Sequence, residues 1–175
     1  GAKVTFVYGP GNEKAPSGAK VINVLSSKEM YDSVKKELKN KFDIVIMAAA
    51  ISDYVPKNPS KKKIKSSNAD ISISLKKAPK IIDQIKKIQK NVLLVGFKAE
   101  TNVTNSQLIK SAKKKLKESS SDIIIANDIG TSRYKKNSQN NQIIIVDSKK
   151  NIVSGWIKKE KIAKIIRKQI ELKLK

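Results

Sequence analysis

The sequence predicts an α/β fold in which a mostly parallel sheet carries helices on both faces, the doubly wound arrangement. Two observations lead to this prediction. Four apolar runs have the length and continuity of strands buried on both faces, and amphipathic helical patterns separate these runs along the chain. A small antiparallel flap or hairpin completes the expected architecture, because one segment alternates strictly between apolar and polar residues.

The four expected strands are mainly β-branched and other apolar residues without regular polar interruptions. Such runs are typical of parallel sheets, in which helices cover both faces. Their sequences are VTFVYG (residues 4–9), DIVIMAAA (43–50), NVLLVGF (91–97) and DIIIAND (122–128).

Each expected helix has an apolar face, and three of the four also have a start signal. Ser26 with Glu29, and Thr104 with Gln107, form capping-box pairs before the first and third helices, and Pro79 suits the first turn of the second. The apolar faces are Met30, Val34 and Leu38; Ile81, Ile82, Ile85 and Ile88; Leu108, Ala112 and Leu116; and Ile162, Ile165, Ile166 and Ile170 in a last helix over residues 158–174.

Two further segments predict antiparallel pairing. DISISLKKA (70–78) alternates between apolar and polar residues, as a strand with one solvent-exposed face does. We expect this strand to pair beside the loop that precedes it. NQIIIVD and KNIVSGW flank the turn residues SKK and predict a closing hairpin, with Trp156 near the last helix. No linker rich in Pro, Gly or Ser divides the chain, so we expect residues 1–175 to form a single domain.

Composition excludes several classes of function. The chain has no cysteine and no histidine, which excludes disulfides, serine-histidine triads and zinc sites built on these residues. No run of 18 or more apolar residues and no signal peptide is present, so we expect a cytoplasmic protein without a membrane partner. The net charge of +23 first suggests nucleic acid, but only Arg133 and Arg167 among 38 basic residues are arginine. Nucleic acid is therefore disfavoured as the partner, and an anionic small substrate remains compatible.

Ligands of open parallel sheets bind beyond the carboxyl ends of the strands, so the residues after each run are candidates. In MAAAISDY the small side chains let a flat ring approach the backbone, and Asp53 can accept from ribose hydroxyls. Taken alone, the alanines favour the other interpretation, packing against a helix. In GFKAET, Phe97 can stack on a base, and Glu100 can order the turn or hold a metal through water. Asn127 and Asp128 are ordinary turn residues as well as polar ligands.

Three lysines carry the charge that a triphosphate needs: Lys63 and Lys65 in KKKIKSS, and Lys115 in SAKKKLKE. In a chain with 36 lysines, any single lysine is more often a solvated residue than a ligand. GPGNEKAPSG (9–18) leads to a short strand rather than to a helix, which makes it a weak candidate for a phosphate loop.

The motifs taken together are more specific than any one of them. AAAISDY, KIK, KAPKII, VGFKAET, AKKKLKESSSDIIIAND and NSQNNQIIIV, in this order and at these intervals, resemble the phosphopantothenoylcysteine synthetase family, the Rossmann-like ligase domain of coenzyme A biosynthesis. GAKVTFVYGP also matches the second strand of that family. The resemblance spans essentially the whole chain.

The resemblance implies a ligase that joins 4'-phosphopantothenate to L-cysteine. The bacterial and archaeal members of the family usually use CTP with Mg²⁺: the substrate carboxylate attacks the α-phosphate, diphosphate leaves, and the amine of cysteine displaces CMP from the acyl-cytidylate. The sequence leaves open whether ATP replaces CTP here. The resemblance also implies a homodimer, because family sites are completed across a two-fold axis.

Carried over position by position, the resemblance assigns site residues in this chain. Lys63 is the expected catalytic lysine of a flexible flap. The expected nucleotide-binding residues are Met47, Ala48 and Ala49 around cytosine and ribose, Asp53, Lys63, the turn of Pro79, Lys80, Ile81 and Ile82, then Phe97 packed on the nucleotide and Lys115 at its phosphates.

Three departures from the family pattern matter. Lys80 stands where an aspartate usually follows the proline, and Ser119 stands where a second phosphate-directed lysine is expected, with Lys117 as a candidate substitute. The family's first strand, its glycine-rich turn and an Asn-Arg-Ser-Ser-Gly segment precede the matched region, and no residue here can be assigned to that asparagine, which the second half-reaction needs. We therefore expect the chain to be a fragment of the domain.

Two other classes of function stay open. One is a nicotinamide-dependent enzyme or another nucleotide-binding protein of this fold, disfavoured because no G-x-G-x-x-G turn follows any strand. The other is a lysine-rich nucleic-acid-binding module, which predicts salt-sensitive duplex binding without nucleotide preference.

Overall fold

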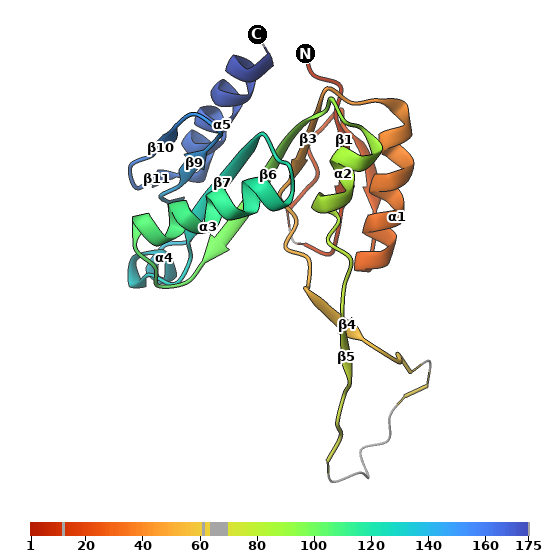
Figure 1. Cartoon of the computed structure of the whole chain (residues 1–175). Coiled ribbons are helices and arrows are strands. Elements are labelled where there is room, and N and C mark those ends of the chain that lie inside the picture. Colours follow the sequence, from red (N-terminus) through yellow and green to blue (C-terminus); the bar gives the residue numbers. More distant parts are fainter. Residues whose placement is uncertain (12, 61, 64–69, 175) are drawn as a thin grey trace. The chain divides into compact units, whose positions relative to one another are not determined.

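The computed structural model describes residues 1–11, 13–60, 62–63 and 70–174, and the chain divides into two compact units (Figure 1). Unit 1 consists of Gly1–Lys36 and Ala49–Ile81, and unit 2 consists of Glu37–Ala48 and Ile82–Lys175. Each unit has its own strands and helices and is described by itself.

Unit 2 is built on a mixed five-stranded sheet of order β10-β9-β7-β6-β3. β3 pairs with β6, and β6 with β7, in parallel, whereas β9 is antiparallel to both β7 and β10. These strands are β3 (Ile44–Met47), β6 (Leu93–Glu100), β7 (Ile123–Asp128), β9 (Ile144–Val146) and β10 (Asn151–Val153). The parallel centre and the closing hairpin of β9 and β10 confirm the predicted fold class.

Helices cover both faces of this sheet (Figure 1). On one face lies α3 (Asn105–Glu118), on the other α5 (Lys159–Leu174), and β7 contributes alternate residues to the two layers. The first layer contains Leu108, Ala112, Ile124, Ala126, Ile144 and Val146; the second contains Val95, Ile123, Ile125, Ile143, Ile145, Ile162 and Ile170. Each fully buried isoleucine stabilises the fold by about 1.5–3 kcal/mol, so these layers make up the core of unit 2.

α2 (Ile82–Ile88) packs against β6 on the same face as α3. A Cβ at Gly96 would lie 2.7 Å from Cδ1 of Ile82 and 2.8 Å from Cδ1 of Ile124, so the missing side chain lets these two isoleucines meet the strand. Ile81 and Ile85 are buried as predicted, while Ile88 at the end of the helix is exposed.

Both predicted capping-box sites start their helices. Thr104 Oγ1 accepts from the amide of Gln107 at 3.3 Å, and Gln107 Oε1 accepts from the amide of Thr104 at 2.8 Å. Before α1 (Ser27–Glu37), Ser26 Oγ accepts from the amide of Glu29 at 3.1 Å. The Glu29 carboxylate accepts from the amide of Leu25 at 2.9 Å, one residue earlier than in the standard box.

Unit 1 opens with a parallel pair, β1 (Thr5–Tyr8) and β2 (Lys20–Asn23). The segment between them leads to a strand, as predicted, and Gly18 in it has a φ of +79°. The prediction that residues 4–9 and 43–50 are buried on both faces is wrong: β1 is only half-buried, and Ile46 in β3 is half-exposed. Among the described residues each strand has one paired neighbour, because β1 belongs to a two-stranded sheet and β3 lies at the edge of its sheet.

The predicted flap is an antiparallel pair of β4 (Tyr54–Pro56) and β5 (Leu75–Lys77), seen as a narrow ribbon in Figure 1. The strand covers only the end of DISISLKKA, and the expectation of one apolar buried side is wrong. Ile71, Ile73 and Leu75 are each more than half exposed, because in the part of unit 1 that is described nothing packs as a second layer on this two-stranded ribbon.

Short elements complete unit 2: η1 (Leu38–Asn40), α4 (Ser132–Lys136), β8 (Asn140–Asn141) and β11 (Ile157–Lys158). The Arg133 guanidinium of α4 lies 4.6 Å from the centre of the Trp156 ring, a cation–π contact. No helix among the described residues is both long and apolar enough to cross a lipid bilayer.

Candidate functional site

The predicted site residues fall in both units, and the boundary runs through two of the motifs. Unit 2 contains Met47, Ala48, Ile82, Phe97 and Lys115, and unit 1 contains Ala49, Asp53, Lys63, Pro79, Lys80 and Ile81. The two sets are considered separately, starting with unit 2.

The carboxyl ends of β3, β6 and β7 lie at one edge of the unit 2 sheet, because the three strands are parallel. Met47 at the end of β3 pairs in register with Gly96 of β6, and Glu100 pairs with Asp128 of β7. Met47 is half-buried and Ala48 directly after it is exposed. This edge is where a doubly wound sheet accepts a ligand.

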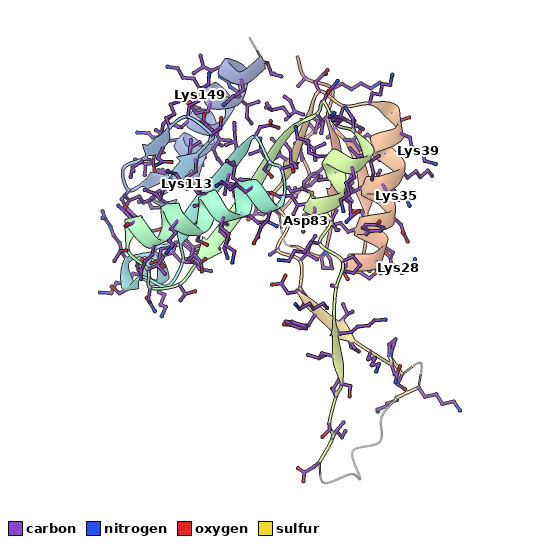
Figure 2. The ribbon with its side chains drawn as sticks, viewed as in Figure 1. Lys28, Lys35, Lys39, Asp83, Lys113 and Lys149 are labelled. Carbon is purple, nitrogen blue, oxygen red and sulfur yellow. The ribbon has the colours of Figure 1, made fainter. Side chains whose placement is uncertain are left out.

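Lys115 lies on the inner side of α3 and is paired. Its Nζ is 3.1 Å from Oδ1 of Asp83, which stands in the first turn of α2 and is labelled in Figure 2. Only 15% of the Lys115 side chain and 30% of the Asp83 side chain is exposed. The sequence held a signal for such a partner, since Leu108, Ala112 and Lys115 share one helical face and a lysine on a buried face needs a carboxylate.

Neither Ser119 nor Lys117 places an ammonium group on the side of α3 that Lys115 occupies. Ser119 is buried, and its hydroxyl donates to the carbonyl of Lys115 at 2.7 Å and shares a hydrogen bond of 2.7 Å with the Ser121 hydroxyl. Lys117 is exposed, and two residues along an α-helix correspond to a rotation of roughly 200°, so it points away from the side that Lys115 occupies.

Phe97 and Lys115 lie on opposite faces of the unit 2 sheet. Phe97 pairs in register with Ile125, which packs in the α5 layer, while its neighbour Gly96 faces α2 and Ile124. The Phe97 ring is 37% exposed. The structure therefore does not bring the predicted stacking residue next to the predicted phosphate lysine.

Asp128 and Glu100 hold the turn between β6 and α3. Asp128 accepts from the amides of Asn102 at 2.9 Å, Val103 at 2.8 Å and Gly130 at 2.7 Å. Burial raises the pKa of Asp128, but these three backbone hydrogen bonds outweigh burial and leave its pKa below the ordinary value.

Glu100 Oε1 accepts from the Ser111 hydroxyl at 2.5 Å and lies 3.1 Å from Nζ of Lys98. The hydrogen bond from Ser111, followed by that from Lys98, lowers the pKa of Glu100. Of the two roles predicted for Glu100, these contacts favour the ordering of the turn.

The described residues contain no group of three or more carboxylates that could hold a metal, and the chain has no histidine or cysteine.

In unit 1, the Asp53 and Pro79 segments are joined by the backbone. The amide of Ala78 donates to the carbonyl of Asp53 at 2.9 Å, next to the pairing of β4 and β5. The side chains of Ala49, Asp53, Pro79 and Lys80 are exposed, whereas Ile81 is buried. Lys63 is exposed in the connection between β4 and β5, and Lys65 lies outside the described residues.

Comparison with known families identifies the family of the chain. A family model described as DNA/pantothenate metabolism flavoprotein C-terminal domain matches residues 1–173. The chain belongs to this family. The match confirms the resemblance that the motifs predicted.

Members of the flavoprotein C-terminal domain family include the coenzyme A biosynthesis bifunctional protein CoaBC. The chain is 37% identical over 148 residues to CoaBC of Thermococcus kodakarensis, an alignment that covers 83% of this chain and 35% of that protein. It is 34% identical over 176 residues to CoaBC of Vibrio parahaemolyticus, covering 98% of this chain and 43% of that protein. The chain thus spans less than half the length of these relatives.

The fold agrees with solved structures of the same family. The crystal structure of the C-terminal domain of CoaBC matches with a TM-score of 0.77 and 28% identity, covering 98% of this chain and 74% of that one. Because nearly all of this chain takes part, the likeness extends over both units.

Proposed function

We propose that residues 1–175 belong to a single ligase domain that joins 4'-phosphopantothenate to L-cysteine in coenzyme A biosynthesis, with CTP converted to CMP and diphosphate. The observation that carries the proposal is the family match over residues 1–173. The CoaBC relatives support it, since their name places them in coenzyme A biosynthesis.

The proposed reaction has two steps. A carboxylate oxygen of phosphopantothenate attacks the α-phosphorus of CTP, and the bond from that phosphorus to diphosphate breaks. The amine of cysteine then attacks the acyl carbon of the acyl-cytidylate, loses a proton and displaces CMP. Neither step needs histidine or cysteine in the protein, because the main task is to hold anions together and to neutralise charge that builds up on phosphorus.

The proposed residue roles are those that the family resemblance implies. Lys63 neutralises charge at the reacting phosphate, and the half-buried Lys115 binds the phosphate chain that carries magnesium. We assign the nucleoside to the residues that the resemblance places around it: Met47, Ala48, Ala49, Asp53, Pro79, Lys80, Ile81, Ile82 and Phe97. We further propose that the active form is a homodimer.

The test follows diphosphate release in a mixture of CTP, magnesium, phosphopantothenate and cysteine, with ATP replacing CTP in a parallel reaction. Lys63→Gln is expected to lose on the order of a hundredfold in rate, the size of one transition-state charge contact. Lys62→Gln is the matched control, because it removes the neighbouring exposed lysine and is expected to keep the rate. A chain of the family's full domain length that releases no diphosphate with either nucleotide would refute the ligase.

The competing classes give different outcomes. Diphosphate release without the cysteine adduct would indicate the first half-reaction alone. Nucleotide binding without diphosphate release would indicate a nucleotide-binding protein of another activity, and salt-sensitive duplex binding with no nucleotide preference would indicate a nucleic-acid-binding module.

A further inference from the structure

Three alternate residues of β6, Gly96, Lys98 and Glu100, lie on the face of the sheet that α2 and α3 cover. Gly96 meets Ile82 of α2 on this face, and Glu100 accepts a hydrogen bond from Ser111 of α3. Lys98 stands between them in the strand, so its side chain leaves on the same face.

The Lys98 ammonium is held close to α3. Its Nζ lies 3.1 Å from Oε1 of Glu100, and the same oxygen accepts from the Ser111 hydroxyl at 2.5 Å. Ser111 precedes Lys115 by four residues, so the two share one side of α3, with their Cβ atoms about 5–6 Å apart. Lys98 and Lys115 are therefore neighbours along α3, each held by one carboxylate.

These two lysines are more covered than the lysines that pair along single helices. Only 35% of the Lys98 side chain and 15% of the Lys115 side chain is exposed, against 86% for Lys28 and 78% for Lys114 in ion pairs along single helices. The side chains of two other paired lysines, Lys86 and Lys173, are also mostly covered. The partner of Lys86, Asp122, directly precedes β7 and so lies at the amino end of that strand, and Lys173 belongs to α5 on the opposite face of the sheet from α3. Lys98 and Lys115 thus form a distinct pair of pre-positioned ammonium groups.

We propose that Lys98 is the second phosphate-binding lysine of this chain and that Lys98 and Lys115 together bind the triphosphate of the nucleotide. The inference rests on the proposed function and deepens it. It supplies the second cation that neither Ser119, whose hydroxyl is already bonded, nor the outward Lys117 provides.

The two carboxylates do not prevent this role. An ammonium group has three N–H donors. Lys115 uses one on Asp83, and Lys98 uses one on Glu100 and one on the carbonyl of Ala99 at 3.4 Å, so each keeps at least one donor for a phosphate oxygen. The carboxylates hold the ammonium groups in place before the ligand arrives, which lowers the entropy lost on binding. The four side chains carry no net charge together, so their contribution depends on the placement of donors and not on a long-range field.

The experiment measures the affinity of the full chain for CTP, CMP and inorganic triphosphate at roughly physiological salt, where nonspecific attraction to a highly basic chain is screened. Lys98→Gln is expected to weaken CTP and triphosphate binding about tenfold and CMP binding less than twofold, and Lys98→Arg to restore most of the loss. Lys113→Gln is the matched control, because Lys113 is an exposed lysine on the same helix (Figure 2) and is expected to keep all three affinities.

The results separate this inference from the proposed function. Unchanged CTP affinity in Lys98→Gln, or equal losses for CTP and CMP, would overturn the inference, even with an active ligase. Loss of triphosphate binding in Lys98→Gln but not in Lys113→Gln, in a chain that ligates with neither CTP nor ATP, would support the anion site and refute the ligase. If Lys98→Gln lowers the melting temperature, the double variant Lys98→Gln with Glu100→Gln removes both charges of the pair. The affinities of this double variant for CTP, CMP and triphosphate are then compared with those of Glu100→Gln alone.

Discussion

Lys115 and Asp83 join α3 to α2 through an ion pair of 3.1 Å, with most of both side chains covered. The pair links positions 32 residues apart on one face of the unit 2 sheet. A covered ammonium without a counter-ion is costly, so the two residues depend on each other.

Asp83→Asn is expected to lower the free energy of unfolding by about 1–2 kcal/mol, because it leaves the covered Lys115 ammonium without a full counter-charge. Urea denaturation measures the change. Asp32→Asn serves as the control, since it breaks the exposed pair with Lys28 and is expected to change stability by less than about 0.5 kcal/mol. Equal changes in the free energy of unfolding for the two substitutions would contradict the prediction that the Lys115 pair stabilises the fold more than the exposed pair does.

Asp128→Asn is expected to reduce stability most at neutral pH and least in acid. The folded-state pKa of Asp128 is below its ordinary value, so its ionised form contributes stability above the unfolded pKa of about 3.9. That contribution disappears as the pH falls through the folded pKa. Unfolding curves of both proteins between pH 7 and about pH 2 should therefore converge. A stability difference that stays constant over this range would show that the carboxylate charge plays no part.

Gly130→Ala is expected to destabilise the chain by about 1–3 kcal/mol through overpacking. An added Cβ would lie 2.6 Å from the backbone nitrogen of Asn102, in the turn that Asp128 holds. Gly155→Ala provides the control, because the nearest atom to its added Cβ is Cγ2 of Ile157 at 3.9 Å. Thermal unfolding of both variants measures the difference, and a melting temperature equal to that of Gly155→Ala would mean that the turn adjusts without cost.

Ile73→Ser is expected to change the free energy of unfolding by less than about 0.5 kcal/mol, because Ile73 is exposed beside the β4 and β5 ribbon. Ile85→Ala, by contrast, removes a fully buried side chain from α2 and is expected to cost about 2–5 kcal/mol. Chemical denaturation of both variants tests the corrected interpretation of DISISLKKA. A loss for Ile73→Ser close to that of Ile85→Ala would show that the segment has a buried side after all.

The sequence by itself determined four of the helices, the central strands and the family, but not the short helix α4. Capping pairs such as Thr104 with Gln107, the 3.6-residue spacing of Leu108 and Ala112, and continuous runs such as DIIIAND depend on residues close in the chain, and local physical chemistry is enough to identify them. The motif order likewise predicted the family that the match over residues 1–173 confirms.

Only the tertiary structure decided which side chains meet and which faces are covered. The pairing of Lys115 with Asp83, the placement of Lys98 beside α3 and the separation of Phe97 from Lys115 across the sheet all involve residues from different elements. The exposure of Ile46 and Ile73 likewise could not be predicted from the local apolar pattern. An apolar pattern states which residues can be buried, whereas burial itself requires a second layer, and its presence depends on contacts between segments far apart in the chain.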